Sequence, residues 1–179
     1  KVLDGLAFAK RHQGQYLVSA GLEAANALRD WLREETSVSQ IEIAGSLRRR
    51  KETVKDVDLL AAGSDPDRIM ARFVEAPGVE TVTSRGDTKS SVVLASGIAA
   101  DLRVVSGAQF PYALAHFTGS KDHNVVMRQR AKDRKMKLNE YGLFHGEDRL
   151  VRCEDEEAVF AALDLPYIPP ELREDRGEF

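Results

Sequence analysis

An α+β fold is predicted for this chain by three features of its sequence. Segments with the two-residue alternation of strands occur mainly before residue 106, whereas helical periodicity dominates the remainder. Positive charge is also concentrated in one stretch of the second part, residues 121–137. A length of 179 residues is enough for one domain or for two small ones. We place the change of character between residues 106 and 118.

The first part is predicted to begin with a helix followed by two strands. Apolar residues at helical spacing and a capping Ser19 predict the helix over residues 19–35. Alternation of apolar and polar residues predicts the first strand over 39–45. The second strand, expected over 56–62, is an apolar run interrupted by aspartates.

A second helix and a hairpin are expected to complete this part. The helix begins at Pro66, which suits a first helical turn, and stops before Pro77–Gly78. A short strand is expected over 79–83. The stretch 90–105 predicts a β-hairpin that turns at Ser96–Gly97, because β-branched residues occupy both arms.

The second part is predicted to be mostly helical, with short strands near its centre. Ser120 follows a Thr-Gly turn and is a suitable cap for a long basic helix. A proline-rich stretch near the end predicts an extended, stiff exit. The expected elements are a helix over 108–117, a helix from Ser120 to about Lys135, short strands around Gly146, a short helix over 155–163 and the exit segment over 165–170.

The composition excludes several classes of protein. A single cysteine, Cys153, excludes an internal disulfide and fits a reducing, cytoplasmic setting. No apolar run approaches the roughly 18 residues of a membrane span, and no signal peptide is recognisable. The formal net charge of −3 requires any nucleic-acid surface to be local. A first residue other than methionine and a charged end after a proline-rich stretch lead us to expect a segment of a longer protein.

Three aspartates are candidates for catalysis. Asp56 and Asp58 are two residues apart in a predicted strand, so their side chains share the face opposite Val57. Asp101 lies in the second arm of the predicted hairpin and joins them if the two strands are neighbours. Unit charges roughly 4 Å apart repel by about 4 kcal/mol at an effective dielectric near 20, so such a cluster favours protonation or a divalent cation such as Mg²⁺ or Mn²⁺. A D-x-D pair alone is also compatible with aspartates on the solvent side of a half-exposed sheet.

A small-residue turn next to three arginines is a candidate phosphate site. Gly45–Ser46 ends the first predicted strand, and a turn of this kind lets backbone N–H groups converge on an anion. The guanidinium groups of Arg48, Arg49 and Arg50 are suited to phosphate. The alternative is a plain turn followed by a solvated basic loop. The P-loop pattern is absent.

Residues 121–137 form the basic surface that the overall charge conceals. Seven basic and two acidic side chains give this stretch a local net charge of +5. Phosphate contacts here would make nucleic-acid binding sensitive to salt. The alternative is a solvated helix face without a partner. His123 and His145 are expected at the surface, because their separation gives no metal-binding spacing.

Four motifs occur in order along the chain. "GSLRRRKETVKDVDLL" places Gly-Ser before an Asp-x-Asp pair, and a third aspartate follows at a distance. "HFTGSKDHNVVMRQRA" and "LNEYGLF" come next. Together these motifs resemble the family X DNA polymerases, the relatives of DNA polymerase beta, from about residue 40 to about residue 145. The final "YIPPELREDRGE" is similar to bacterial members that carry a C-terminal PHP domain.

The resemblance implies a particular architecture and site. Residues 1–106 would form a nucleotidyltransferase palm with a mixed β-sheet flanked by helices, and residues 107–179 a small α/β thumb-like subdomain with an exit linker. Asp56, Asp58 and Asp101 would be catalytic and would hold two Mg²⁺ ions, or Mn²⁺. The implied nucleotide-binding residues are Gly45, Ser46, Arg49, His116, Phe117, Gly119 and Asn124. The implied DNA-binding residues are Lys121, Arg128, Arg130 and Lys132.

The implied activity is that of a DNA-directed DNA polymerase core, which adds dNTPs to a primer 3′-hydroxyl by two-metal phosphoryl transfer in gap-filling repair. Its partners would be gapped or primed double-stranded DNA, dNTPs and further domains of the same chain, namely an N-terminal helical domain and the PHP domain. We expect the segment alone to bind gapped DNA weakly. Two alternatives are an untemplated nucleotidyltransferase and a non-catalytic DNA-binding module that positions an attached nuclease domain.

Three residues depart from the family pattern. His116 stands where many relatives have tyrosine, which leaves discrimination against ribonucleotides open. Lys121 replaces an aspartate of some relatives. Ala99 replaces an arginine two residues before the third aspartate. None of these departures removes an implied metal ligand.

Overall fold

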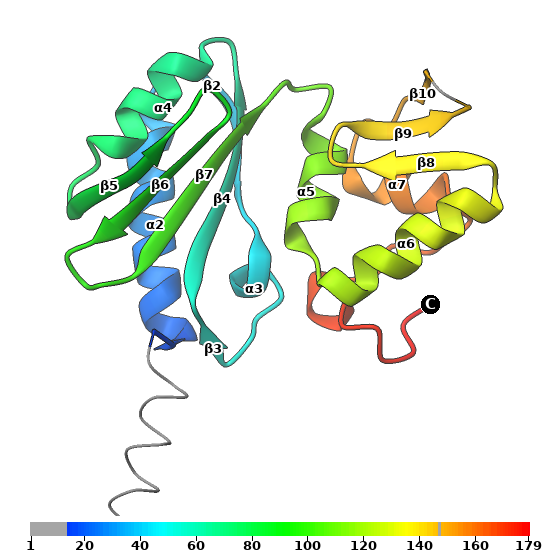
Figure 1. Cartoon of the computed structure of the whole chain (residues 1–179), viewed down its shortest axis with the longest axis horizontal. Helices are drawn as coiled ribbons and strands as arrows, with labels where there is room; N and C mark the ends of the chain where they lie inside the picture. Colours follow the sequence, from blue (N-terminus) through cyan, green and yellow to red (C-terminus); the bar gives the residue numbers. More distant parts are fainter. Residues whose placement is uncertain (1–13, 147) are drawn as a thin grey trace, which may run out of the picture.

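A five-stranded mixed sheet forms the first part of the molecule (Figure 1). The computed structural model describes residues 14–146 and 148–179. The sheet has the strand order β2-β4-β7-β6-β5, in which β4 and β7 are parallel and the other neighbours antiparallel. Its strands are β2 (Val38–Ile43), β4 (Asp56–Gly63), β5 (Val79–Arg85), β6 (Lys89–Leu94) and β7 (Ala99–Val105). The short strands β1 (Tyr16–Leu17) and β3 (Thr53–Val54) pair separately.

Two helices cover one face of this sheet. They are α2 (Val18–Arg33) and α4 (Pro66–Val74), and Figure 1 shows both on the same side of the strands. Apolar residues of each helix recur at helical spacing and pack on alternate residues of the central strands. The buried residues of this core include Ala25, Leu28, Leu32, Val57, Leu59, Ala61, Ile69, Met70, Phe73, Ala100 and Leu102.

The other face of the sheet is covered at one end only. Helix α5 (Phe110–Thr118) packs Phe110 and Leu114 against Leu60 and Ala62 of β4. The second half of β4 is therefore buried on both faces. Its first half keeps the alternation of a half-exposed strand. The side chains that precede Leu60 on this face are consequently left accessible.

The second part packs three helices on a three-stranded antiparallel sheet. Ser120 Oγ accepts a hydrogen bond from His123 N and caps the long helix, as predicted. Asp155 caps the last helix in the same way. Besides α5, the elements are α6 (Lys121–Asp133), β8 (Met136–Asn139), β9 (Gly142–His145), β10 (Arg149–Val151) and α7 (Glu156–Ala161).

The predicted α+β class and mixed sheet are confirmed, with two local corrections. Ser19 does not cap the first helix, because the helix begins at Val18 and Leu17 occupies the N-cap position. Gly45–Ser46 is not a plain turn, since these residues begin the short helix α3 (Gly45–Arg48). The division of the chain between residues 106 and 107 stays a prediction.

The residues that follow the expected exit segment do not lead away from the molecule. After a 3₁₀ turn, η1 (Pro170–Leu172), the chain folds back along α6 (Figure 1). Arg173 is fully buried, and the ring of Phe179 stacks on His123 at 4.8 Å. His123 is therefore buried rather than at the surface, and its Nδ1 lies 3.0 Å from Glu178 Oε1. Charged residues of this segment also pair with the body of the molecule, Arg173 with Glu156 and Glu174 with Arg49.

Candidate active site

The register of β4 and β7 brings the three aspartates to one place. The two strands are parallel neighbours, and Asp58 and Asp101 are directly paired across them. Asp56 precedes Asp58 by two residues and lies on the same face, opposite the buried Val57. Asp56 is exposed, and the other two aspartates are half-buried. The structure thus groups Asp56, Asp58 and Asp101 at the open end of the sheet.

Electrostatic repulsion is visible at this group. Burial of Asp58, together with the charges of Asp56 and Asp101, raises the pKa of Asp58 to about 6. Lys89 Nζ lies 2.6 Å from Asp101 Oδ2 and offsets part of the charge. Within the described part of the chain, no three His, Cys, Asp or Glu side chains have the spacing of a metal site.

Gly45 forms the wall of the site beside Asp58. Its φ is +60°, in the left-handed region that favours glycine. A Cβ at this position would overlap Asp58 Oδ2, so only glycine leaves room for the carboxylate. The backbone N–H of Ala44 donates to Asp58 O at 2.8 Å and holds the start of α3 against β4. The Gly-Ser pair is thereby fixed next to the aspartates.

Two consecutive arginines connect α3 to the second part of the molecule. Arg48 donates to Thr118 Oγ1 at 2.7 Å and makes a bidentate pair with Glu156 at 2.8 and 2.9 Å. Arg49 donates through Nη1 to Thr118 O at 2.6 Å and through Nε to Glu174 Oε1 at 2.8 Å. Both guanidinium groups therefore meet at Thr118. The predicted phosphate ligand Arg49 is held in a defined orientation.

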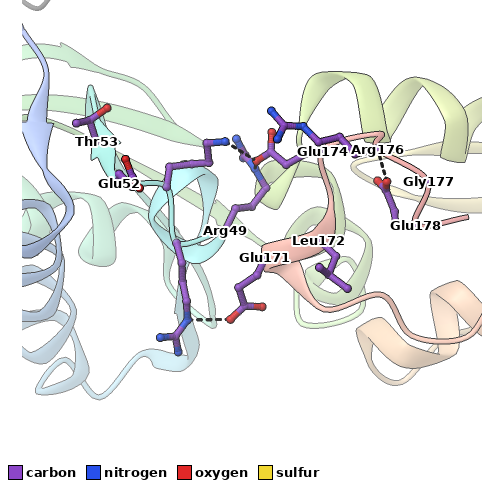
Figure 2. Close-up of a pocket in the computed structure, with 11 residues that line it drawn as sticks. Arg49, Glu52, Thr53, Glu171, Leu172, Glu174, Arg176, Gly177 and Glu178 are labelled. Atoms are coloured by element: carbon purple, nitrogen blue, oxygen red, sulfur yellow. Dashed lines mark hydrogen bonds and ion pairs between the residues drawn. The ribbon is translucent and has the colours of Figure 1, made fainter.

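An open cleft lies between this arginine cluster and the C-terminal segment (Figure 2). Lys51 Nζ lies 3.5 Å from Glu174 Oε1, and Arg50 Nε lies 2.8 Å from Glu171 Oε1. In Figure 2 these acidic side chains come from the C-terminal segment and face the basic ones. The cleft does not include the three aspartates. We therefore locate the candidate active site by the aspartates rather than by this cleft.

The residues expected to line the nucleotide sugar follow one another at the end of α5. The rings of His116 and Phe117 are edge-on at 4.9 Å. Asn124 Nδ2 donates to His116 O at 2.7 Å, which ties α6 to α5. Burial lowers the pKa of His116, so its imidazole is neutral near neutral pH. A Cβ at Gly119 would lie 3.1 Å from Arg49 Nη1, so these residues adjoin the arginine cluster.

The predicted DNA-binding residues on α6 differ from one another in exposure and in hydrogen bonding. Lys121 and Lys132 are exposed, and Arg128 is half-buried. Arg130 instead donates to Leu163 O at 2.7 Å and to a neighbouring carbonyl at 2.9 Å. Its guanidinium thereby binds two carbonyl groups that follow the end of α7. The DNA-binding role of Arg130 stays a prediction.

Four residues that were not predicted as site residues contact the motifs. Lys89, Glu156 and Glu174 each form an ion pair with a residue of the motifs, and Thr118 accepts from two arginines. Lys89 lies one residue before the hairpin predicted over 90–105, because β6 begins at Lys89 rather than at Ser90. Glu156 and Glu174 carry no signal in the sequence, because their partners lie far away along the chain.

Comparison with known proteins identifies the family. A family model for the DNA polymerase beta thumb matches residues 113–174. The chain is 38% identical over 181 aligned residues to the DNA polymerase/3′-5′ exonuclease PolX of Bacillus subtilis. This alignment covers 99% of this chain and 32% of that relative. It is 28% identical to the repair DNA polymerase X of African swine fever virus, over 87% of this chain and 98% of the viral protein. The chain belongs to the family X DNA polymerases.

The family X assignment agrees with the fold. A crystal structure of Leishmania infantum polymerase beta in a ternary complex matches with a TM-score of 0.78 and 26% identity, over 94% of this chain and 80% of that one. The chain spans about a third of the length of its B. subtilis relative, 32%. No helix among residues 14–146 and 148–179 is long and apolar enough to cross a membrane. The resemblance to family X that the motifs indicated is confirmed.

Proposed function

We propose that this chain is the core of a DNA-directed DNA polymerase that adds dNTPs to a primer 3′-hydroxyl in gap-filling repair. The parallel register of β4 and β7, which sets Asp58 beside Asp101, carries the proposal. Membership of family X and similarity to a repair polymerase support it. The proposal includes a palm over residues 1–106 and a thumb-like subdomain over 107–179. It also includes further domains of the same chain.

The aspartates of this chain fit divalent cations. They supply only oxygen ligands, and the ammonium of Lys89 already places a positive charge at Asp101. The absence of a side chain at Gly45 leaves room for the Asp58 carboxylate, which a Cβ there would overlap. When bound at Asp56, Asp58 and Asp101, two Mg²⁺ or Mn²⁺ ions would lower the pKa of the primer hydroxyl and neutralise charge on the triphosphate.

The triphosphate of the incoming nucleotide would bind at Gly45, Ser46 and Arg49. Contacts to Glu174 and Thr118 use Nε and one N–H of Nη1 of Arg49. They fix the guanidinium plane and leave its other N–H groups for phosphate oxygens. This arrangement provides orientation before the nucleotide arrives, which lowers the cost of ordering it on binding.

The sugar and base would lie between α5 and α6. His116, Phe117 and Gly119 would line the sugar, and Asn124 would reach the base edge. The neutral imidazole of His116 can donate or accept one hydrogen bond, so it can interact with a 2′-hydroxyl as well as exclude one. We therefore propose that sugar selectivity depends on the side chain at position 116. Replacing it with tyrosine tests this directly.

DNA would lie along the outer side of α6. Lys121 and Lys132 are exposed there, and Arg128 is close to Asn124 on the same helix. Lysine and arginine contacts to phosphates release counterions, so the affinity for DNA should fall steeply as salt rises. Arg130 would contribute through Nη1, because its Nε and Nη2 donate to carbonyl groups that follow α7.

Primer extension tests the proposed function. The chain is supplied with Mg²⁺, four dNTPs and either a gapped, primed duplex or an unprimed single strand. Extension that follows the template on the primed duplex supports the polymerase. Addition of one nucleotide to the unprimed acceptor would favour an untemplated nucleotidyltransferase. DNA binding without extension in Mg²⁺ or Mn²⁺ would favour a non-catalytic module.

Comparison of Gly45→Ala with Gly78→Ala distinguishes the effect of backbone strain from the effect of a clash with Asp58. Gly45→Ala and Gly78→Ala both place a side chain at positive φ, at +60° and +87°. Each should lower the free energy of unfolding by about 1–2 kcal/mol. Only Gly45→Ala puts a Cβ into Asp58, whereas the space around Gly78 is open. We expect primer extension to fall about a hundredfold for Gly45→Ala and to stay unchanged for Gly78→Ala. Equal rates for the two variants would contradict the role of Gly45.

A further inference from the structure

Lys89 contacts the candidate active site from a strand outside the sequence motifs. In the antiparallel pair of β6 and β7, Lys89 lies opposite Arg103, and Asp101 lies opposite Ser91. Lys89 and Asp101 are therefore diagonal neighbours on one face, within reach of a long side chain. The Nζ–Oδ2 distance is 2.6 Å, and the side chains are 38% and 27% exposed.

Lys89 differs from the other cation on this face. Arg103 follows Asp101 by two residues on β7, but its guanidinium lies over the ring of Phe117 at 4.4 Å. Among the described residues, Lys89 makes the one ion pair to the three aspartates. It therefore contacts the group at which a divalent cation would bind. The flexible stem and moderate exposure of Lys89 let its ammonium move into water at low cost.

We propose that Lys89 is a positioning residue that holds Asp101 as an internal counter-ion until a divalent cation displaces it. This inference rests on the proposed metal site and adds a competitor to it. The ammonium and the incoming cation are attracted to the same carboxylate oxygen. The metal-free protein is thereby relieved of part of the repulsion between its aspartates, and the affinity for metal is lowered in return.

The competition predicts a gain of metal affinity when the ammonium is removed. Mn²⁺ alone is titrated into the full 179-residue chain without nucleotide or DNA, and free Mn²⁺ is followed by electron paramagnetic resonance. Lys89→Met should bind Mn²⁺ about three- to tenfold more tightly than the wild type. Lys137→Met, which removes an exposed lysine from β8, is the matched control and should change nothing. Asp101→Asn should weaken the same site.

A second readout distinguishes competition from an ordinary surface ion pair. In EDTA, Lys89→Met should lower the Tm, because the aspartates lose their counter-ion. With saturating Mg²⁺ the difference from the wild type should vanish, because the bound cation then displaces the Lys89 ammonium in the wild type and supplies the missing counter-charge in the variant. An ordinary ion pair would give the same Tm difference in both buffers.

The outcomes separate this inference from the proposed function. Unchanged or weaker Mn²⁺ binding by Lys89→Met, at a site that Asp101→Asn still weakens, would overturn the role of Lys89 and leave the metal site intact. A Tm difference that Mg²⁺ does not alter would also overturn it. Mn²⁺ binding that is insensitive to Asp101→Asn would remove the metal site, and the inference with it.

Discussion

Asp101→Asn is expected to reduce primer extension about a thousandfold or more. The amide keeps the shape of the side chain but removes one of the three charges that would bind divalent cations. Asp101 is directly paired with Asp58 across β4 and β7, so no neighbouring carboxylate can replace it without a shift of a strand. The rate of single-nucleotide insertion on a primed template, with the substitution as the only change, measures the effect.

Two controls accompany this substitution. Asp67→Asn removes an exposed aspartate from the first turn of α4, on the covered face of the sheet, and should leave the rate unchanged. The affinity of Asp101→Asn for DNA should stay within about twofold of the wild type, because α6 carries the basic surface. A variant that kept about a tenth of the wild-type rate would show that Asp101 does not bind an essential cation.

Glu156→Ala is expected to lower the free energy of unfolding by about 3–5 kcal/mol. Glu156 is 6% exposed and forms ion pairs with Arg48 at 2.8 Å and with the fully buried Arg173 at 2.6 Å. Tyr167 donates a further hydrogen bond to it. Removal of the carboxylate would leave the fully buried Arg173 and the half-buried Arg48 without this counter-charge. Urea denaturation of both proteins gives the difference.

Glu157→Ala is the matched control. It changes the next residue of the same helix turn, where the side chain is exposed, and should stay within about 0.5 kcal/mol of the wild type. A similar loss for both variants would mean that helix α7 rather than the ion pairs accounts for the effect. Glu156→Gln, which keeps the shape, should fall between the wild type and the alanine variant.

The contribution of Glu156 should also depend on pH. Burial alone would raise its pKa, but hydrogen bonds from Arg48 and Arg173 outweigh burial and hold the pKa at about 2. A carboxyl whose pKa is lowered on folding stabilises the protein above its ordinary pKa of 4.5, and this stability is lost as the pH falls toward 2. The gap in stability between the wild type and Glu156→Gln should therefore close over that range.

Glu156 joins elements that the sequence motifs keep apart. Arg48 belongs to the Gly-Ser motif, Arg173 to the C-terminal segment and Glu156 to α7. Arg48 also donates to Thr118, beside the residues expected to bind the sugar. These contacts hold the phosphate side and the sugar side of the candidate site in one arrangement. The C-terminal segment is therefore part of the folded unit.

Local patterns in the sequence predicted part of this site. Alternation in β4 predicted that Asp56 and Asp58 share a face, and the structure has them opposite the buried Val57. This prediction succeeded because the direction of a side chain is set by the backbone of its own strand. The same alternation does not describe Leu60, which α5 buries on the other face. The apolar run after Asp58 is compatible with burial on both faces, but the strand sequence does not say which element covers the second face.

The amino-acid sequence by itself determined the helical and extended segments, the three aspartates and the Gly-Ser-Arg cluster, because each follows from spacing within a short stretch. Only the tertiary structure decided which charges meet. Arg48 and Arg49 pair with glutamates that lie 108 and 125 residues away along the sequence. Lys89 pairs with Asp101 because of the register of β6 and β7. Such contacts depend on how strands align and how the two parts pack, which spacing along the chain does not encode.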